Sequence, residues 1–128
     1  MSVLVRLNGN YFVFAKGSPE IIHGFSTRKV KGFDGFLKKL SFSGYRAIGF
    51  GMKDVGGEEV EEVLKGERED FLKQIAITGV VTFINELKTD AIETIATLSS
   101  AKINTKIITG DNIFLGVQTA LSTGMIEK

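Results

Sequence analysis

Alternating apolar and polar positions at the start of the chain predict a β-hairpin. Residues 3–15 are rich in valine, leucine, tyrosine and phenylalanine, and Asn8-Gly9-Asn10 interrupts them. Asn-Gly tolerates the positive φ angles that a tight hairpin turn needs. The second strand runs directly into Lys16-Gly17-Ser18-Pro19-Glu20, where Ser18 can cap a helix whose first residue is Pro19.

The next apolar pattern has helical spacing, and a strand pattern follows it. Apolar residues recur between Phe33 and Phe42 on one face of a helix, and Gly44 is placed to end that helix. Residues 45–52, YRAIGFGM, alternate as a strand does, with Arg46 and Phe50 on the same face. The two glycines inside this strand indicate a bulge or a close backbone approach.

A charged stretch separates this strand from the next one. Residues 53–70 predict a solvated excursion with a short amphipathic helix at 58–65, and residues 68–74 predict a further turn or two of helix. Residues 75–84, IAITGVVTFI, are rich in β-branched side chains and predict another strand. The first part of the chain is therefore expected to be α+β, an antiparallel sheet with flanking helices.

The pattern changes near Asn85. Thr89 or Asp90 can cap a helix that runs to Ser100, and a strand is predicted from Asn104 to Ile108. A last helix is predicted over residues 113–123, closed by a glycine. Strand, helix, strand and helix in this order are typical of a βαβ unit in a parallel sheet, so we expect two parts, residues 1–84 and 85–128.

Composition excludes several classes of chemistry. The chain has no cysteine and one histidine, which excludes disulfides, thiol nucleophiles and zinc sites of the Cys/His kind. The net charge of +1 gives no global field for nucleic acid or anionic membranes, so any phosphate site must be local. No apolar run approaches the ~20 residues that span a bilayer, and no secretory signal is evident, so we expect a cytoplasmic location.

One loop has the residue types of a phosphate site. Thr109-Gly110-Asp111-Asn112 follows the last predicted strand, where the next helix would present its free N–H groups. Gly110 permits close approach, Thr109 offers a hydroxyl, and Asp111 offers a carboxylate for Mg²⁺ or for orienting Thr109. The alternative is that Asp111 or Asn112 only caps the helix, and the spacing alone favours this alternative.

Two basic residues are further candidates. Lys16, at a strand end before Gly17, could contact a nucleotide, although composition alone favours a solvated lysine. Arg46 could present its planar fork to phosphate, and an arginine on the exposed face of a half-buried strand is about equally compatible with the pattern. The sequence contains neither a GxxxxGK[ST] motif nor a complete GxGxxG motif.

Five motifs in a fixed order resemble the cytosolic region of P-type ATPases. They are, from the amino end, Phe14-Ala15-Lys16-Gly17-Ser18-Pro19-Glu20, Gly44-Tyr45-Arg46, Phe83-Ile84-Asn85-Glu86-Leu87-Lys88, Ile108-Thr109-Gly110-Asp111-Asn112 and Thr123-Gly124-Met125-Ile126. Ser18 and the Asn85-x-Leu87-Lys88 joint resemble the fifth subfamily of these ATPases, described as polyamine or cation transporters and, in one branch, helix dislocases. The chain is therefore expected to be a piece of a longer membrane protein.

The resemblance implies a division of labour. Residues 1–84 would be the C-terminal part of the nucleotide-binding (N) domain, and residues 85–128 a partial phosphorylation (P) domain of the Rossmann-like, haloacid-dehalogenase (HAD) kind. Lys16 and Gly17 would line the adenine pocket, and Arg46 would reach the ATP phosphates. Thr109, Gly110 and Asp111 would meet the terminal phosphate, with Asp111 a possible ligand of Mg²⁺.

The family's phosphorylated aspartate, in an Asp-Lys-Thr-Gly-Thr motif, is not in this sequence, and neither is its later Mg²⁺-binding Gly-Asp-Gly-x-Asn-Asp motif. Leu115-Gly116 also stands where the family tends to have Thr-Ala. No catalytic residue is therefore expected in the chain, and an isolated fragment should be inactive.

The resemblance implies ATP and Mg²⁺ as cofactors, the remaining N, P and transmembrane domains as partners, and a place on the cytoplasmic face of a membrane. The alternatives are a stand-alone nucleotide- or phosphate-binding module without catalysis and, disfavoured by the missing aspartate, a small HAD-like phosphatase.

Overall fold

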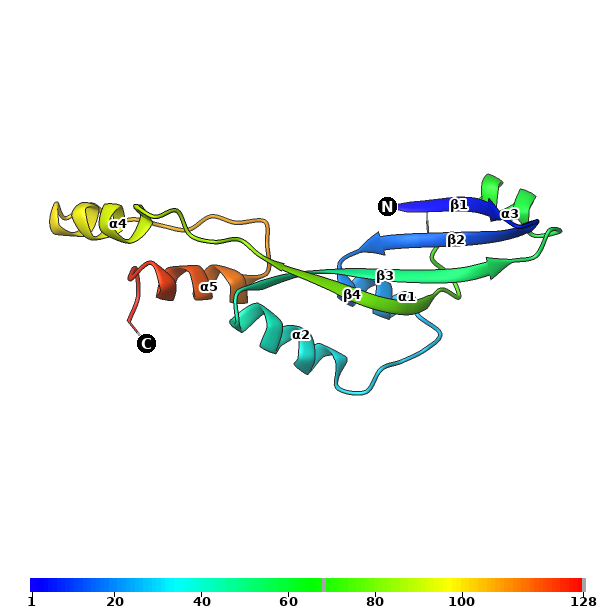
Figure 1. The fold of residues 1–128 in the computed structure, drawn as a ribbon, viewed down its shortest axis with the longest axis horizontal. Coiled ribbons are helices and arrows are strands. Elements are labelled where there is room, and N and C mark those ends of the chain that lie inside the picture. Colours follow the sequence, from blue (N-terminus) through cyan, green and yellow to red (C-terminus); the bar gives the residue numbers. More distant parts are fainter. Residues whose placement is uncertain (68, 128) are drawn as a thin grey trace. The chain divides into compact units, whose positions relative to one another are not determined.

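The computed structural model describes residues 1–67 and 69–127. In chain order, the helices and strands are β1 (Ser2–Leu7), β2 (Asn10–Gly17), α1 (Pro19–Phe25), α2 (Phe33–Phe42), β3 (Tyr45–Val55), α3 (Val60–Lys65), β4 (Ala76–Ile84), α4 (Ala91–Ser100) and α5 (Ile113–Ser122) (Figure 1). The contacts divide the chain into two compact units. The first unit comprises Met1–Asp34 and Ala47–Thr82, and the second comprises Gly35–Arg46 and the chain from Phe83 onward.

The four strands form one sheet in which each strand lies beside its neighbour in the chain, in the order β1-β2-β3-β4 (Figure 1). The β1–β2 and β2–β3 pairs are antiparallel. Leu7 pairs with Asn10 at the hairpin end, and the two turn residues Asn8 and Gly9 have φ angles of 50° and 85°. The predicted hairpin and the predicted antiparallel sheet with flanking helices are therefore confirmed.

One face of the sheet in the first unit is buried and the other is open. Along β2, Val13 and Ala15 are buried whereas Phe14 and Lys16 are exposed, as the two-residue period of a strand requires. Part of the core is a cluster of three buried valines with partly buried neighbours: Val13, Val55 and Val63, with Leu4, Tyr11, Val60 and Phe71. The open face carries the exposed side chains that matter for the candidate site.

Two glycines of β3 let other segments pack closely on the buried face. A Cβ atom at Gly49 would lie 2.7 Å from the Cα of Pro19, the first residue of α1. A Cβ atom at Gly51 would lie 3.0 Å from Ile75 and 3.1 Å from Ile22. The predicted close backbone approach is therefore confirmed at Gly49, where it fixes the turn between β2 and α1 against the sheet, whereas at Gly51 the close neighbours are side chains.

A buried serine joins the segment after α1 to the start of β4. The Ser26 hydroxyl oxygen accepts hydrogen bonds from the backbone N–H groups of Ile77 (2.9 Å) and Arg28 (3.1 Å), and the hydroxyl donates to the Arg28 carbonyl. Ser26 is only 2% exposed and forms a parallel bridge with Ile75. No sequence pattern distinguished this residue, because a single serine in a loop has no periodic signal.

The second unit contains α4, α5 and most of α2. Helix α2 ends as predicted, with Gly44 at a φ of 83°, and the rings of Phe42 and Phe114 lie 4.6 Å apart between their centroids. Helix α4 has no buried residue, and Ile92 is 56% exposed. Of the apolar stripe predicted for α4, Ala91, Ile95 and Leu98 are half-buried whereas Ile92 and Ala96 are exposed, so the described residues cover the stripe only in part.

The strand predicted over residues 104–108 is wrong, and with it the βαβ order. These residues belong to no strand, and their backbone groups make no hydrogen bond to another described residue. A strand is stable only beside a hydrogen-bonded neighbour, and none reaches this segment. Ile108 is 97% exposed as a result. The assignments of residues 1–84 as N-domain-like and 85–128 as HAD-like stay predictions.

The turn or two of helix predicted over residues 68–74 is present, where the structure describes it, as hydrogen-bonded turns over residues 69–74 and not as an assigned helix. The Lys73 N–H donates to the Glu69 carbonyl with the spacing of a helical turn, and Arg68 lies outside the described residues. The short helix predicted at 58–65 is present as α3. None of the helices in the described part of the chain has the length and apolar character needed to cross a lipid bilayer.

Candidate functional site

Lys16 lies near the end of β2 with both of its backbone groups paired. Its N–H donates to the Met1 carbonyl, and its carbonyl accepts from the Met1 amino group, both at 2.9 Å. On the other side it pairs in register with Phe50 of β3. The backbone of Lys16 is thus fixed between β1 and β3, while its side chain is exposed on the open face of the sheet.

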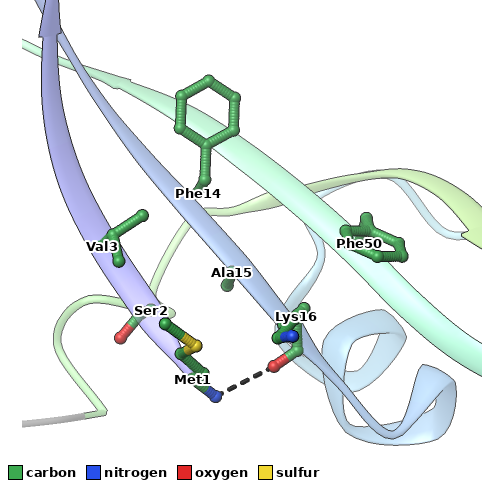
Figure 2. A pocket seen from close by; sticks show the side chains of 7 residues that line it. All are labelled: Met1, Ser2, Val3, Phe14, Ala15, Lys16 and Phe50. Carbon is green, nitrogen blue, oxygen red and sulfur yellow. Dashed lines mark hydrogen bonds between the residues drawn. The ribbon is translucent and has the colours of Figure 1, made fainter.

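A pocket of about 190 Å³ lies beside Lys16 (Figure 2). Its lining residues come from β1, β2 and β3: Met1, Ser2, Val3, Phe14, Ala15, Lys16 and Phe50. Phe14 and Phe50 project from neighbouring strands, and the Lys16 ammonium is the one charged side chain of this lining (Figure 2). Aromatic rings beside a cationic side chain suit a flat, apolar ligand that carries a polar edge.

Gly17 follows Lys16 and pairs with Gly49 across the sheet. A Cβ atom at Gly17 would lie 3.9 Å from Ile22, which is an ordinary contact distance. Packing within the chain therefore gives no reason for a glycine here, unlike at Gly49. Close approach of a ligand to Gly17 stays a prediction.

Arg46 and Asp111, predicted from separate motifs, are brought together in the second unit. The Arg46 guanidinium donates from Nη2 to Oδ1 of Asp111 at 2.7 Å, and the two side chains are 41% and 40% exposed. The guanidinium carbon also lies 5.9 Å from the centroid of the Phe83 ring. Sequence reasoning missed Phe83, since one aromatic residue at a strand end gives no signal of a cationic neighbour.

The loop before α5 has its own hydrogen-bond pattern. The Thr109 hydroxyl oxygen accepts from the Asp111 N–H at 3.0 Å, and the Asn112 side chain accepts from the Phe114 N–H at 2.9 Å. Asn112 is therefore the helix N-cap, which confirms the capping alternative for that residue. Asp111 is left to pair with Arg46, and a Cβ atom at Gly110 would meet open space.

The described residues contain no group of three or more His, Cys, Asp or Glu side chains placed to hold a metal ion. Asp111 is therefore not part of a preformed cluster of three protein ligands among the described residues. A Mg²⁺ ion held mainly by water and phosphate oxygens needs no more than one or two protein carboxylates. The donor set is thus compatible with an ion that arrives with a phosphate ligand.

Comparison with known proteins gives relatives over nearly the whole chain, whereas no family model matches it. A vacuolar cation-transporting ATPase of Saccharomyces cerevisiae is 30% identical over 131 residues, which cover 99% of this chain and 9% of the relative. A probable cation-transporting ATPase of Homo sapiens is 32% identical over 98% of this chain and 11% of its own length. An endoplasmic reticulum transmembrane helix translocase of Saccharomyces cerevisiae is 29% identical over 93% of this chain and 10% of its own length.

The chain thus spans about a tenth of the length of these relatives. The order of its motifs, from Lys16-Gly17 to Thr109-Gly110-Asp111, and the near-complete coverage agree on one family. We conclude that this chain belongs to the type V cation-transporting P-type ATPases and corresponds to one segment of them.

Proposed function

We propose that this chain is a cytosolic ATP-binding piece of a P-type ATPase that uses ATP hydrolysis to drive ion or polyamine transport. The observation that carries the proposal is the aromatic pocket beside Lys16, which lies where the resemblance expects the adenine ring. The parent protein would work through an aspartyl-phosphate on an aspartate outside this sequence. This chain would lie on the cytoplasmic face of the membrane and contribute binding groups rather than the phosphoryl acceptor.

The pocket beside Lys16 would take the base. At about 190 Å³ it is smaller than the ~300 Å³ at which sites for drug-sized ligands begin, so it suits a flat ring rather than a whole nucleotide. Phe14 and Phe50 offer ring faces and edges for stacking on a purine. The Lys16 ammonium can donate to ring nitrogens of the base, and the absence of a side chain at Gly17 lets the ligand approach the backbone.

Arg46 and the loop before α5 would take the phosphates. The guanidinium has five N–H donors, and Asp111 engages only Nη2, so donors remain for phosphate oxygens. Gly110 leaves open space beside the backbone, and Thr109 adds a hydroxyl. Mg²⁺ bound with the nucleotide would neutralise phosphate charge, and Asp111 is the residue that would hold it.

Residues 1–84 would then belong to the N domain and residues 85–128 to an HAD-like P domain, with the remaining N, P and transmembrane domains of the parent as partners. The segment at 104–108, whose backbone groups make no hydrogen bond to another described residue, and helix α4, which has no fully buried residue, fit a domain that is completed by chain from elsewhere in the parent. A parallel sheet of the HAD kind would need helices over both of its faces, and the two helices α4 and α5 are too few to cover them.

ATP titration followed by backbone amide shifts tests the proposal. We expect ATP at millimolar concentration to shift the amides of Lys16, Gly17 and Arg46. Lys16→Gln should weaken binding, whereas Lys38→Gln, at an exposed position of α2, should leave it unchanged. An absence of any shift at 10 mM ATP, with the amide spectrum otherwise folded, would reject nucleotide binding by this chain.

The second candidate is a nucleotide- or phosphate-binding module without catalysis, which the pocket beside Lys16 and the donors of Arg46 would serve equally well. The flanking reading frame separates the two candidates. Upstream codons for that motif, with membrane-spanning segments, would support the ATPase piece, whereas stop codons at both ends would support the module.

A further inference from the structure

The Arg46 guanidinium is held by two different kinds of group within the second unit. Asp111 accepts its hydrogen bond at 2.7 Å, and the Phe83 ring lies with its centroid 5.9 Å from the guanidinium carbon. Arg46 is the second residue of β3, and Phe83 is the penultimate residue of β4, the neighbouring strand of the sheet. The sheet itself therefore brings the cation and the ring together.

The carboxylate alone is a weak support for a long side chain. Both members of the ion pair are about two-fifths exposed, and an exposed pair of this kind contributes little in water because solvent screens it and the arginine loses rotamer freedom. A ring within ~6 Å of a guanidinium adds attraction through its quadrupole and restricts the side chain without consuming a hydrogen-bond donor. A ring thus restrains Arg46 and leaves its remaining donors available.

The exposure of Phe83 is otherwise unexplained. It is 37% exposed at the end of a strand whose last four residues are all exposed, and it is not part of the cluster around Val13, Val55 and Val63. Its ring faces the Arg46 cation. A leucine or valine would serve equally well if Phe83 only covered apolar surface.

We propose that Phe83 is a positioning residue for Arg46, which orients the guanidinium toward the phosphate groups of a nucleotide. This inference rests on the proposed function and adds a residue to it. The ring and the Asp111 carboxylate hold the guanidinium from two directions, and the donors that neither engages bind phosphate oxygens. The ligand class is therefore a polyphosphate ester, and the ring acts through Arg46 rather than by touching the ligand.

The test compares Phe83→Leu, which removes the ring, with Phe83→Tyr, which keeps it, in the full chain. Phe42→Leu is the matched control, because it removes a ring of the same unit that packs on Phe114 instead. Calorimetry gives the dissociation constants for ATP and for adenosine, and NMR follows the Arg46 Nε–Hε signal. Circular dichroism confirms that each variant is folded.

We expect Phe83→Leu to weaken ATP binding about two- to fivefold, as the loss of an exposed cation–π contact implies. Adenosine, which has no phosphate, should bind with unchanged affinity, and the Arg46 side-chain signal should move in Phe83→Leu but not in Phe42→Leu. Phe83→Tyr should bind ATP as the unsubstituted chain does. A merely structural role would instead weaken ATP and adenosine equally.

The inference is overturned if Phe83→Leu leaves both ATP affinity and the Arg46 signal unchanged while the unsubstituted chain binds ATP. It is equally overturned if Phe83→Tyr, which keeps the ring, weakens ATP binding as much as Phe83→Leu does. Failure of the unsubstituted chain to bind ATP at all would instead overturn the proposed function, so the two failures are distinguishable.

Discussion

Arg46 and Asp111 are separated by 65 positions in the chain, yet Nη2 of one and Oδ1 of the other lie 2.7 Å apart. Each had been singled out as a phosphate-site residue for its own reasons, Arg46 for its planar fork and Asp111 for its place before a helix. Their pairing means that a phosphate ligand would meet a cation already partly neutralised by a carboxylate. The positive charge of Arg46 is therefore offset by the negative charge of Asp111 before any ligand binds.

The first prediction concerns this pair. Arg46→Gln should weaken ATP binding strongly and Arg46→Lys partly, because lysine keeps the charge but loses the fork. Asp111→Asn should strengthen the binding of Mg²⁺-free ATP, since it removes a negative charge beside the phosphates. A double-mutant cycle on thermal stability should give a coupling of about 0.2–1 kcal/mol, as for other exposed pairs. Zero effect of Arg46→Gln on ATP affinity would argue against a phosphate role.

The second prediction concerns the close contact between Gly49 and Pro19. Gly49→Ala places a methyl group 2.7 Å from a backbone atom, so we expect it to lower the free energy of unfolding by about 1–3 kcal/mol. Gly79→Ala in β4 is the control, because its Cβ meets nothing within 4 Å. Urea denaturation of both variants is the measurement. Equal stability of the two would show that α1 does not press on β3.

Ser26 gives the third prediction. Ser26→Ala leaves the backbone N–H of Ile77 buried without its acceptor, which typically costs about 1–3 kcal/mol of stability. Ser43→Ala, at an exposed position after α2, should change stability very little. Amide exchange should also become faster at Ile77 in Ser26→Ala. A protected Ile77 amide in that variant would mean that another acceptor replaces the hydroxyl.

The fourth prediction follows from the pair of Asp70 and Lys73. The hydrogen bond from Lys73 (2.6 Å), followed by that from the Glu67 backbone N–H (2.8 Å), lowers the pKa of Asp70 below its ordinary value of 3.8. The same hydrogen bond raises the pKa of Lys73 above 10.5. The Asp70 contribution to stability is therefore present above pH 3.8 and is lost as the pH falls through the lower, folded-state pKa.

The Lys73 contribution to stability depends on pH in the opposite direction. It is present below pH 10.5 and is lost as the pH rises through the higher, folded-state pKa. Thermal unfolding between pH 2 and 6 should show a shallower acid dependence for Asp70→Asn than for the unsubstituted chain. Asp54→Asn, at an exposed position of β3, should keep the original dependence. The same loss of thermal stability between pH 6 and pH 2 in all three proteins would show that Asp70 does not contribute to the pH dependence.

The fifth prediction concerns the bare segment at 104–108. Its backbone groups have no partner among the described residues, so its amides should exchange with solvent within seconds. The amides of Val13 and Phe14 in the centre of the sheet should be strongly protected. Hydrogen exchange read by mass spectrometry or NMR distinguishes them. Slow exchange at 104–108 would indicate pairing with a second copy of the chain.

Local signals predicted the turns and helix ends of residues 1–46 well. The Asn8-Gly9 turn, the start of α1 at Pro19 and the glycine at position 44 each act through the backbone of a few neighbouring residues, and all three appear where expected. The capping predicted for Ser18 is wrong in detail, because its hydroxyl donates to the Glu20 carboxylate and makes no cap hydrogen bond to α1. These are features that the chain determines by itself. The close approach at Gly49 was expected in kind, but its partner Pro19 could only come from three dimensions.

Non-local features account for the rest. The strand predicted over residues 104–108 was based on its β-branched residues, but a strand also needs a neighbour, and the pattern of one segment does not show whether a neighbour exists. The pairing of Arg46 with Asp111 and Phe83 likewise depends on contacts across the fold. The sequence therefore indicated Arg46 and Asp111 one at a time from their chemistry, and the structure shows that they lie in contact.

The division of the chain into units has a practical consequence for experiments that cut it. The polypeptide passes from one unit to the other after residues 34, 46 and 82, so neither unit is a continuous stretch of sequence. A protein truncated at residue 84 would keep Phe42 and Arg46 but lose Phe114 and Asp111, their respective partners. Isolating the first unit would require two changes, the replacement of residues 35–46 with a short linker and the removal of the chain from residue 83 onward.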